Sequence, residues 1–263
     1  MLEYEFMRNA FMAGSVVAIV AGAVGFFLVL RNLTFAGHAL SHVGFAGATG
    51  AVLLGMSALS GLLVFTLAAA VAMGLLGERL RGRDVAVGII LSLALGLGVL
   101  FLSLYTSHAT QATAILFGNV LGVGSETVWA LAGLSLVSIC VLAFISRPLL
   151  FATLAPELAE AKGVSLRLVS VLFLAVVAIA VAEAAQVVGV LLVFALMVGP
   201  AAASLRLTPK LGWGMVLAVS LSLAETWLGI ALAYLTDWPT TFWIVSLSCL
   251  VYFLAQTSKP GRA

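Results

Sequence analysis

Long apolar stretches separated by short polar connections dominate the sequence. Nine of them can be followed, over residues 9–30, 35–56, 58–77, 85–105, 127–146, 167–184, 186–205, 211–235 and 240–256. A helix needs about 20 apolar residues to cross the hydrocarbon core of a bilayer. The stretches also lack the apolar–polar alternation of the strands in a membrane barrel. The pattern predicts one all-α domain, residues 1–263, built as a polytopic transmembrane helical bundle of about nine spans, with eight to ten compatible with the length.

Composition agrees with a membrane protein. Of the 263 residues, 63% are hydrophobic and 8% are charged, whereas a soluble domain carries about 25% charged residues. Glu3 and Glu5 precede the first apolar stretch, where a secretory signal would be basic, so we expect no cleavable signal. Membrane lipid is the expected surroundings of the chain, and we expect no nucleic-acid partner.

Residues 106–126 differ from both a span and a simple loop. They are too short to cross a membrane and are interrupted by glycine and asparagine. Irregular backbone at membrane depth is tolerated only where protein or water satisfies its polar groups. We expect a short re-entrant or interfacial helix here.

The basic residues predict the orientation of the chain. If residues 78–84 are cytoplasmic, alternation of the spans puts all of the 12 Lys and Arg residues except Arg8 on the cytoplasmic side, where such residues accumulate. We therefore expect the N-terminus outside and the C-terminus in the cytoplasm. The outer face then carries His108, Glu126 and Glu183, an outer mouth that suits a cation.

Two histidines, His38 and His42, lie four residues apart inside the second apolar stretch. In a helix this spacing puts both imidazoles on one face, one turn apart. Gly44, Gly47 and Gly50 follow at three-residue intervals, which lets another helix approach closely. Imidazoles at membrane depth are costly unless they meet a partner or a watery path. The pair is a candidate metal or translocation site, and the alternative is a pair that only hydrogen-bonds to neighbouring helices.

Two carboxyl groups lie in the later apolar stretches, and both are candidate pathway residues. Glu183, followed by Gln186, lies near the outer interface, where ordinary solvation competes with a functional role. Glu225 lies deeper, where an ionised carboxylate needs a partner. The Gly199–Pro200 pair should break the hydrogen bonds of its helix and free carbonyl groups, which is useful beside a pathway but also common in ordinary membrane bundles.

The longest cytoplasmic connection, residues 147–166, contains the signals of a short helix. Pro156 suits the first helical position, Glu157 and Glu160 favour the first turn, and Gly163 suits the stop. The segment is either an ordinary amphipathic connector or a docking helix for a cytoplasmic partner.

The chain has no motif for binding ATP. It contains no G-x-x-x-x-G-K-[ST] loop for phosphates, and no H-E-x-x-H or Cys/His cluster for a protease or a structural zinc site. We expect no enzymatic activity and no permanently bound cofactor. If ATP drives transport, a partner subunit binds it.

Three stretches resemble one known family, the integral-membrane permease subunits of bacterial ABC importers for zinc, manganese or iron. The first, F-A-G-H-A-L-S-H-V-G-F-A-G-A-T-G-A, resembles the second-helix motif of the family, G-D-x-L-(S/A)-H-x-x-x-x-G. The second, P-E-L-A-E-A-K-G-V, is similar to the cytoplasmic loop that docks on the ATPase. The third, V-V-G-V-L-L-V-F-A-L-M-V-G-P-A-A-A-S, is similar to V-G-x-L-L-x-x-A-L-L-x-x-P-A-A.

The resemblance implies an all-helical permease in the bacterial cytoplasmic membrane, working as a homodimer with two copies of a cytoplasmic ABC ATPase. It also implies an extracytoplasmic metal-binding protein that delivers the ion. On the same grounds His38 and His42 meet the metal, and the loop with Pro156, Glu157, Glu160 and Gly163 couples to the ATPase. Transport would proceed by alternating access.

His38 departs from the family pattern, which commonly has Asp at this position, and Ala46 stands where relatives often carry Pro. Imidazole sites rank Zn²⁺ above Mn²⁺, so zinc is the predicted cargo, with manganese or iron next. One alternative is an ABC permease for cobalamin or an iron chelate. The other is a stand-alone secondary cation transporter or channel, which needs no docking helix.

Overall fold

The structure, a computed structural model, describes residues 3–76, 83–104 and 115–257. All regular elements of these residues are helical, which confirms the all-α prediction for this part of the chain. The elements are α1 (Glu5–Leu30), α2 (Thr34–Leu53), α3 (Ala58–Leu76), α4 (Arg83–Ser103), η1 (Val120–Gly122), α6 (Ser125–Leu154), α7 (Pro156–Ala161), α8 (Leu166–Val188), α9 (Val193–Leu207), α10 (Leu211–Thr236) and α11 (Thr240–Thr257).

Each predicted apolar stretch contains one long helix, but the prediction of about nine spans is not confirmed. Within the described ranges, 7 helices are long and apolar enough to cross a membrane, and α2 and α9 are not among them. The histidines and glycines of α2 make it too polar. The 15 residues of α9 reach about 22 Å at 1.5 Å per residue, less than the ~30 Å hydrocarbon core of a bilayer.

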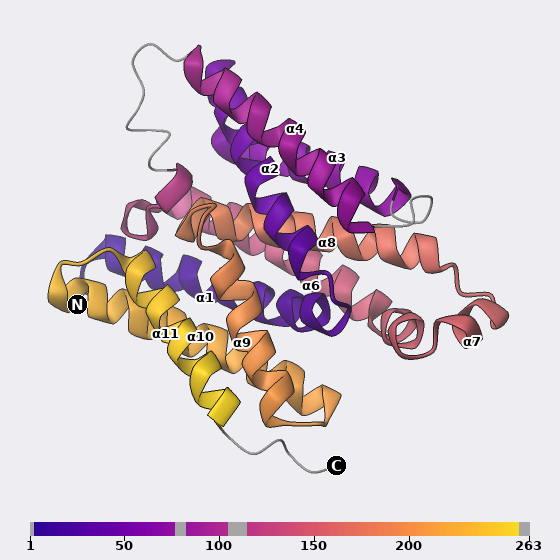
Figure 1. Ribbon diagram of the computed structural model, residues 1–263. Coiled ribbons are helices and arrows are strands. Elements are labelled where there is room, and N and C mark those ends of the chain that lie inside the picture. The colour runs from indigo at the N-terminus through magenta and orange to yellow at the C-terminus, as the bar shows by residue number, and fades with distance from the viewer. Residues whose placement is uncertain (1–2, 77–82, 105–114, 258–263) are drawn as a thin grey trace.

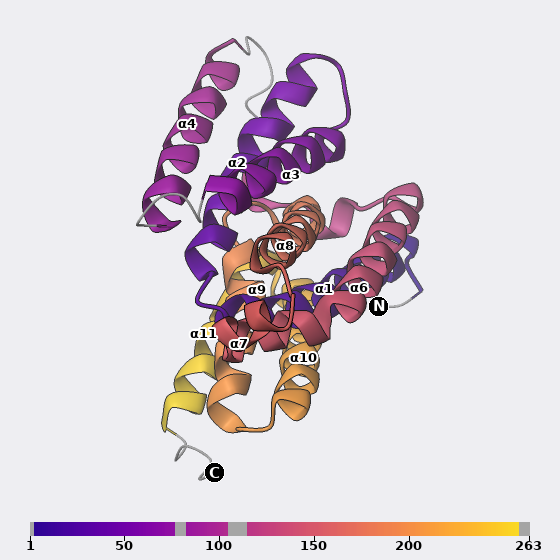
Figure 2. The same ribbon diagram turned by 90° about the vertical axis from the view of Figure 1, so that its right-hand side faces the viewer.

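Helices α1 and α8 form the centre of the bundle. In each, 72% of the most apolar stretch is buried, against 22–39% in the other five candidate spans. Helices α2, α3 and α4 pack on one another and lie together on one side of α8 (Figures 1 and 2). Helix α9 lies among α1, α10 and α11, and α6 packs against both α1 and α8.

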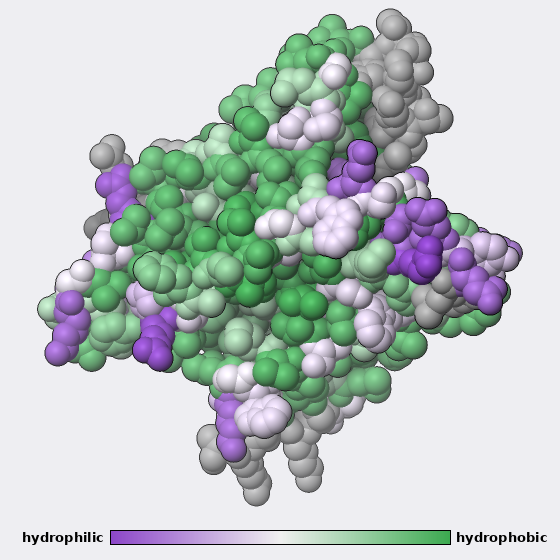
Figure 3. Space-filling view, turned by 180° about the vertical axis from the view of Figure 1, so that it is seen from behind, coloured by the Kyte–Doolittle hydropathy of each residue, from purple (hydrophilic) through white to green (hydrophobic). Residues whose placement is uncertain are grey.

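The two ends of the bundle carry its polar residues. The start of α1 and the α10–α11 connection lie at one end, and α7 lies at the opposite end (Figure 1). Seen from behind, a broad apolar surface separates hydrophilic side chains at the two edges (Figure 3). This distribution fits a chain that crosses a bilayer, while its orientation relative to the cytoplasm stays a prediction.

The close helix approach predicted along α2 is confirmed. A Cβ at Gly47 would meet the carbonyl oxygen of Gly61 in α3, and a Cβ at Gly61 would meet that of Gly47. Gly44 packs against the side chains of Leu62 and Thr66 in α3, and Gly50 packs against the ring of Phe101 in α4. Because lipid tails are as apolar as side chains, close packing rather than burial from water favours association of such helices.

Two predicted helix boundaries are wrong. Helix α6 continues through Pro148 to Leu154, so the connection that follows is much shorter than residues 147–166. Helix α9 likewise continues through Pro200. A proline removes one helical hydrogen bond, which a membrane helix tolerates when its neighbours pack around it. The chain leaves the helical conformation earlier, at Gly189, where φ is 86°, a value that favours glycine.

The predicted re-entrant or interfacial helix falls partly outside the described residues, because residues 105–114, with His108, are not among them. The first described residues after this gap, 115–117, are α-helical, and the 3₁₀ helix η1 follows after two residues. The Asn119 side chain accepts a hydrogen bond from the N–H of Gly122 at 3.0 Å and fixes this turn.

Gly61→Ala should destabilise the protein, because the added methyl group meets the backbone of α2. Overpacking of this kind costs about 1–3 kcal/mol. Gly133→Ala in α6 is the matched control, since a Cβ there meets nothing within 4 Å. Reversible unfolding in mixed detergent micelles measures both free energies. A Gly61→Ala protein as stable as the Gly133→Ala protein would contradict the proposed role of this contact.

Candidate metal site and its surroundings

The two histidines of α2 lie together, as their spacing predicts. Their ring centroids are 4.8 Å apart and the rings are nearly perpendicular, at 83°. Both side chains are half-buried. Phe194, at the start of α9, packs edge-on against His38 with 5.4 Å between the ring centroids. Helices α2 and α9 therefore hold the imidazole pair jointly.

The pair by itself is an incomplete metal site. In the described part of the chain, no three His, Cys, Asp or Glu side chains are arranged to hold a metal ion. The hydroxyl of Ser41, between the histidines, donates to the carbonyl oxygen of His38 at 2.7 Å. The two histidines supply two nitrogen ligands, whereas structural Zn²⁺ takes four. Any metal bound there therefore needs further ligands from water, backbone or another chain.

Helix α9 is positioned by the break that follows α8. The N–H groups of Val190 and Leu191 donate to the carbonyl oxygens of residues 115–116 at 3.2 and 3.3 Å. Gly118 and Gly189 lie back to back, since a Cβ at either would meet the backbone of the other segment. The segment before η1 thus supplies the backbone partners that α8 and α9 lack at their junction.

Glu183 is fully buried, with 0% of its surface exposed, whereas the sequence suggested a solvated position near the outer interface. The difference arises because α8 continues to Val188 and places Glu183 more than a turn inside its end. Ser135 of α6 donates to Oε2 at 2.5 Å, and Ser138 donates to Oε1 at 3.4 Å. Their three-residue spacing within an apolar stretch is the sequence signal that would have identified these two hydroxyls.

The other acidic candidates also lie apart from the histidines. Glu126 is exposed in the first turn of α6, as a residue at an outer mouth should be. Glu225 is 2% exposed in α10, and neither of its carboxyl oxygens has a hydrogen-bond partner among the described residues. The predicted pathway residues that the structure describes are therefore not gathered into one site within a single chain.

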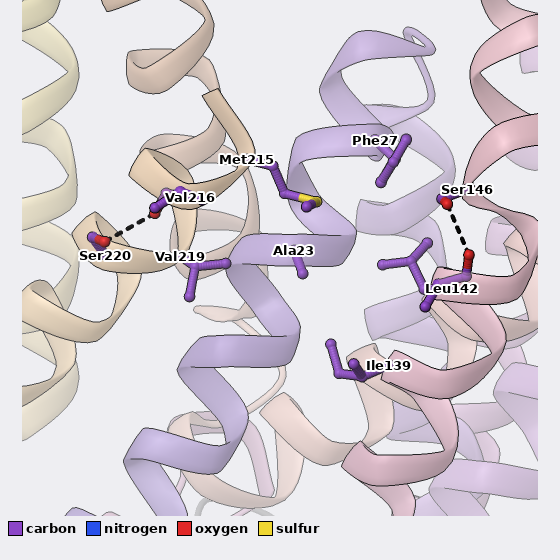
Figure 4. A pocket seen from close by; sticks show the side chains of 10 residues that line it. Ala23, Phe27, Ile139, Leu142, Ser146, Met215, Val216, Val219 and Ser220 are labelled. Carbon is purple, nitrogen blue, oxygen red and sulfur yellow. Dashed lines mark hydrogen bonds between the residues drawn. The ribbon is translucent and has the colours of Figure 1, made fainter. Parts of the chain in front are cut away.

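Two hollows of different character flank the bundle centre. One, of about 200 Å³, lies between α3, α6, α8 and η1 and is lined in part by Asn119, Thr127 and Gln186. The other, of about 400 Å³, lies between α1, α6 and α10 and has almost entirely apolar walls (Figure 4). Its two hydroxyls, Ser146 and Ser220, donate to carbonyl groups of their own helices. Only the first offers polar side chains to a hydrated ion.

The predicted short helix of the long connection is confirmed as α7. Pro156 occupies its first position, and Glu157 and Glu160 are exposed. Gly163 ends it with φ of 82°, and the N–H of Val164 donates to the carbonyl oxygen of residue 159 at 2.9 Å, a common way to end a helix. Helix α7 projects from the end of the bundle opposite the start of α1 (Figure 1).

Ser135→Ala should destabilise the protein by about 1–3 kcal/mol, because a buried carboxyl oxygen loses its hydrogen bond. Ser146→Ala, in the same helix, is the control, since its hydroxyl donates to Ala143 of its own turn at 2.8 Å. Unfolding in detergent micelles compares the two variants. If Ser135→Ala costs no more stability than Ser146→Ala, the hydroxyl does not hold Glu183.

Comparison with known proteins agrees with the motifs of the sequence. The model of the ABC 3 transport family matches residues 3–259. The manganese transport system membrane protein MntC of Listeria monocytogenes is 29% identical over 263 residues, which are 100% of this chain and 94% of that protein. A probable iron transport system membrane protein of Haemophilus influenzae is 31% identical over 257 residues, which are 97% of this chain and 94% of that protein.

A solved structure has the same fold. The structure of PsaBC from Streptococcus pneumoniae in complex with Fab contains a chain that superimposes with a TM-score of 0.87 and is 26% identical. The match covers 98% of this chain and 94% of that one. The family resemblance predicted from the sequence is thereby confirmed, and this chain belongs to the ABC 3 transport family.

Proposed function

We propose that this chain is the membrane-spanning permease subunit of an ATP-driven importer that carries a divalent metal ion across the bacterial inner membrane. The observation that carries the proposal is the imidazole pair of His38 and His42, held between α2 and α9 inside a bundle of this family. Imidazoles inside a membrane protein are costly unless they meet a partner or a watery path, and neutral imidazole is a common ligand of divalent metals.

Manganese is the cargo that the names of the relatives support best, and iron also occurs among them. Zinc, which the sequence predicted, has no such support. It stays the second candidate because two nitrogen donors favour Zn²⁺ over Mn²⁺. Since affinity alone does not choose the ion in a cell, delivery to the permease decides between them.

The arrangement suits passage of the ion better than its storage. Within the described residues, one chain offers two nitrogen donors and no third His, Cys, Asp or Glu side chain placed to complete a metal site with them. A conducting site must bind an ion firmly enough to admit it and weakly enough to release it. In the proposed homodimer each copy contributes one imidazole pair, and alternating access exposes them first to the extracytoplasmic metal-binding protein and then to the cytoplasm.

Helix α7 is proposed to receive the two cytoplasmic ABC ATPase subunits. It projects from the bundle end, and its Glu157 and Glu160 face solvent while Ala159 is buried. Leu158 is 54% exposed on the same short helix. An exposed leucine between acidic residues suits a protein partner with an apolar pocket and basic rim.

His42→Ala should lower metal uptake by roughly tenfold or more, because even an outer-shell partner of a metal ligand is worth that much. His38→Asp should keep uptake and shift preference toward Mn²⁺, since an oxygen donor replaces a nitrogen. Uptake into vesicles containing the permease, its ATPase and its binding protein measures both, with Ser41→Ala as control. Undiminished uptake of Mn²⁺ and Zn²⁺ by a His38→Ala, His42→Ala double variant would make the pair purely structural.

Glu157→Arg should abolish ATP-driven uptake while the protein stays at its normal level in the membrane, because it reverses a charge on the proposed docking helix. Glu5→Arg is the matched control, as an exposed glutamate in the first turn of α1, at the end of the bundle opposite α7. Co-purification of the ATPase with each variant gives a second measurement. Normal uptake by the Glu157→Arg protein would show that α7 only connects α6 and α8 and does not dock the ATPase.

A further inference from the structure

The two buried carboxyl groups of the bundle differ in their partners. Both oxygens of Glu183 accept a serine hydroxyl, from Ser135 and Ser138. Both oxygens of Glu225 lack a hydrogen-bond partner in the described part of the chain, although the residue is 2% exposed. A buried polar group without a partner is unfavourable, so something other than the described residues should satisfy Glu225.

Glu225 lies where α10 meets α9 and α11. The hydroxyl of Ser248 in α11 lies within hydrogen-bonding reach of its carboxyl group, but the geometry of that contact does not make it a hydrogen bond. That hydroxyl has one proton, which it donates to the carbonyl oxygen of Ala195 in α9 at 3.0 Å. Gly199 makes room for this contact, because a Cβ there would meet Ser248 Oγ. Ser248 therefore presents oxygen lone pairs to the carboxylate, which is itself an acceptor.

A second hydroxyl nearby is also without a partner. Ser222 lies three residues before Glu225, on the same side of α10, and is fully buried. Its Oγ makes no hydrogen bond within the described residues. Thr226, by contrast, donates to the carbonyl oxygen of Ser222 at 2.8 Å, which is the usual way in which helical hydroxyls are satisfied. The unbonded Ser222 hydroxyl is thus a further oxygen donor for a ligand.

Among the described residues of α1, α9, α10 and α11, no cation is positioned to neutralise Glu225. Helix α11 has no charged residue, and Glu225 is the only one in α10. Arg206 lies in the last turn of α9, and Glu5 and Arg8 lie in the first two turns of α1, where both are exposed. The other titratable groups of α10 and α11 are the thiol of Cys249 and the phenols of two tyrosines, all neutral at ordinary pH.

We propose that Glu225, Ser222 and Ser248 form a buried site for one small alkali cation, of the Na⁺ type, at the junction of α9, α10 and α11. All donors are hard oxygens, which suit cations of this class rather than soft metals. One carboxylate balances one positive charge, whereas a divalent ion would leave an uncompensated charge in the protein interior. A cation between acceptors that otherwise face each other turns their repulsion into attraction.

The site is separate from the imidazole pair, and the proposal does not depend on the cargo of the permease. The two sites are connected through α9, where Phe194 contacts His38 and the next residue, Ala195, accepts the Ser248 hydroxyl. A bound cation would hold α9 against α10 and α11 from the side away from α2. Binding of the cation should therefore raise the stability of the whole bundle.

Thermal unfolding of the purified full-length permease, with sodium chloride exchanged for choline chloride at constant pH and ionic strength, tests the site. At sodium concentrations of ten times the dissociation constant, linkage predicts a rise in Tm of about 3–6 °C. Glu225→Gln should lose this sodium dependence, because it removes the anchoring charge. Glu183→Gln is the matched control and should keep it.

A wild-type Tm that is indifferent to sodium would overturn the proposal, since the carboxyl group would then be held in its neutral form without a metal cation. An equal sodium response in wild type and Glu225→Gln would also overturn it. If the Glu225→Gln protein does not fold, the Ser222→Ala protein tests the cation site instead. It should need severalfold more sodium for the half-maximal shift, and an unchanged midpoint counts against the site.

Discussion

The bundle depends on the satisfaction of backbone groups at one place where its helices are interrupted. At membrane depth an unpaired N–H or C=O costs several kcal/mol, yet the chain leaves the helix between α8 and α9. Carbonyl groups of residues 115–116 accept the N–H groups of Val190 and Leu191, and paired glycines allow the two backbones to touch. Helix α9 can therefore begin at Val193 and bring Phe194 to His38.

The sequence predicted the helices because each is a continuous apolar stretch, and it predicted the histidine pair because four-residue spacing is a local property of a helix. It also predicted α7 from residues that begin and end helices. It did not predict where the chain is interrupted. Pro200 suggested a break that packing suppresses, while Gly189 marks the real one, and only contact with a segment more than 70 residues earlier stabilises it.

The same reasoning explains which parts of the candidate site were missed. Glu183 looked interfacial because burial depends on the neighbouring helix, which no local pattern reveals. Its partners, Ser135 and Ser138, lie in α6, 48 and 45 residues away in sequence. Helix α6 has 30 residues and is about 45 Å long. It joins this buried hydrogen-bond pair to the exposed α7, so that the two ends of the bundle share one continuous element.

The reciprocal contact of Gly47 and Gly61 has a consequence for how this protein can evolve. In most packed residue pairs, a larger side chain at one position can be offset by a smaller side chain at the other. Here each position already has the smallest side chain, so neither can compensate for growth of its neighbour. Two such positions stay fixed together rather than vary together. Methods that find contacts through correlated substitutions will therefore overlook this glycine pair, although it is one of the tightest helix contacts in the described bundle.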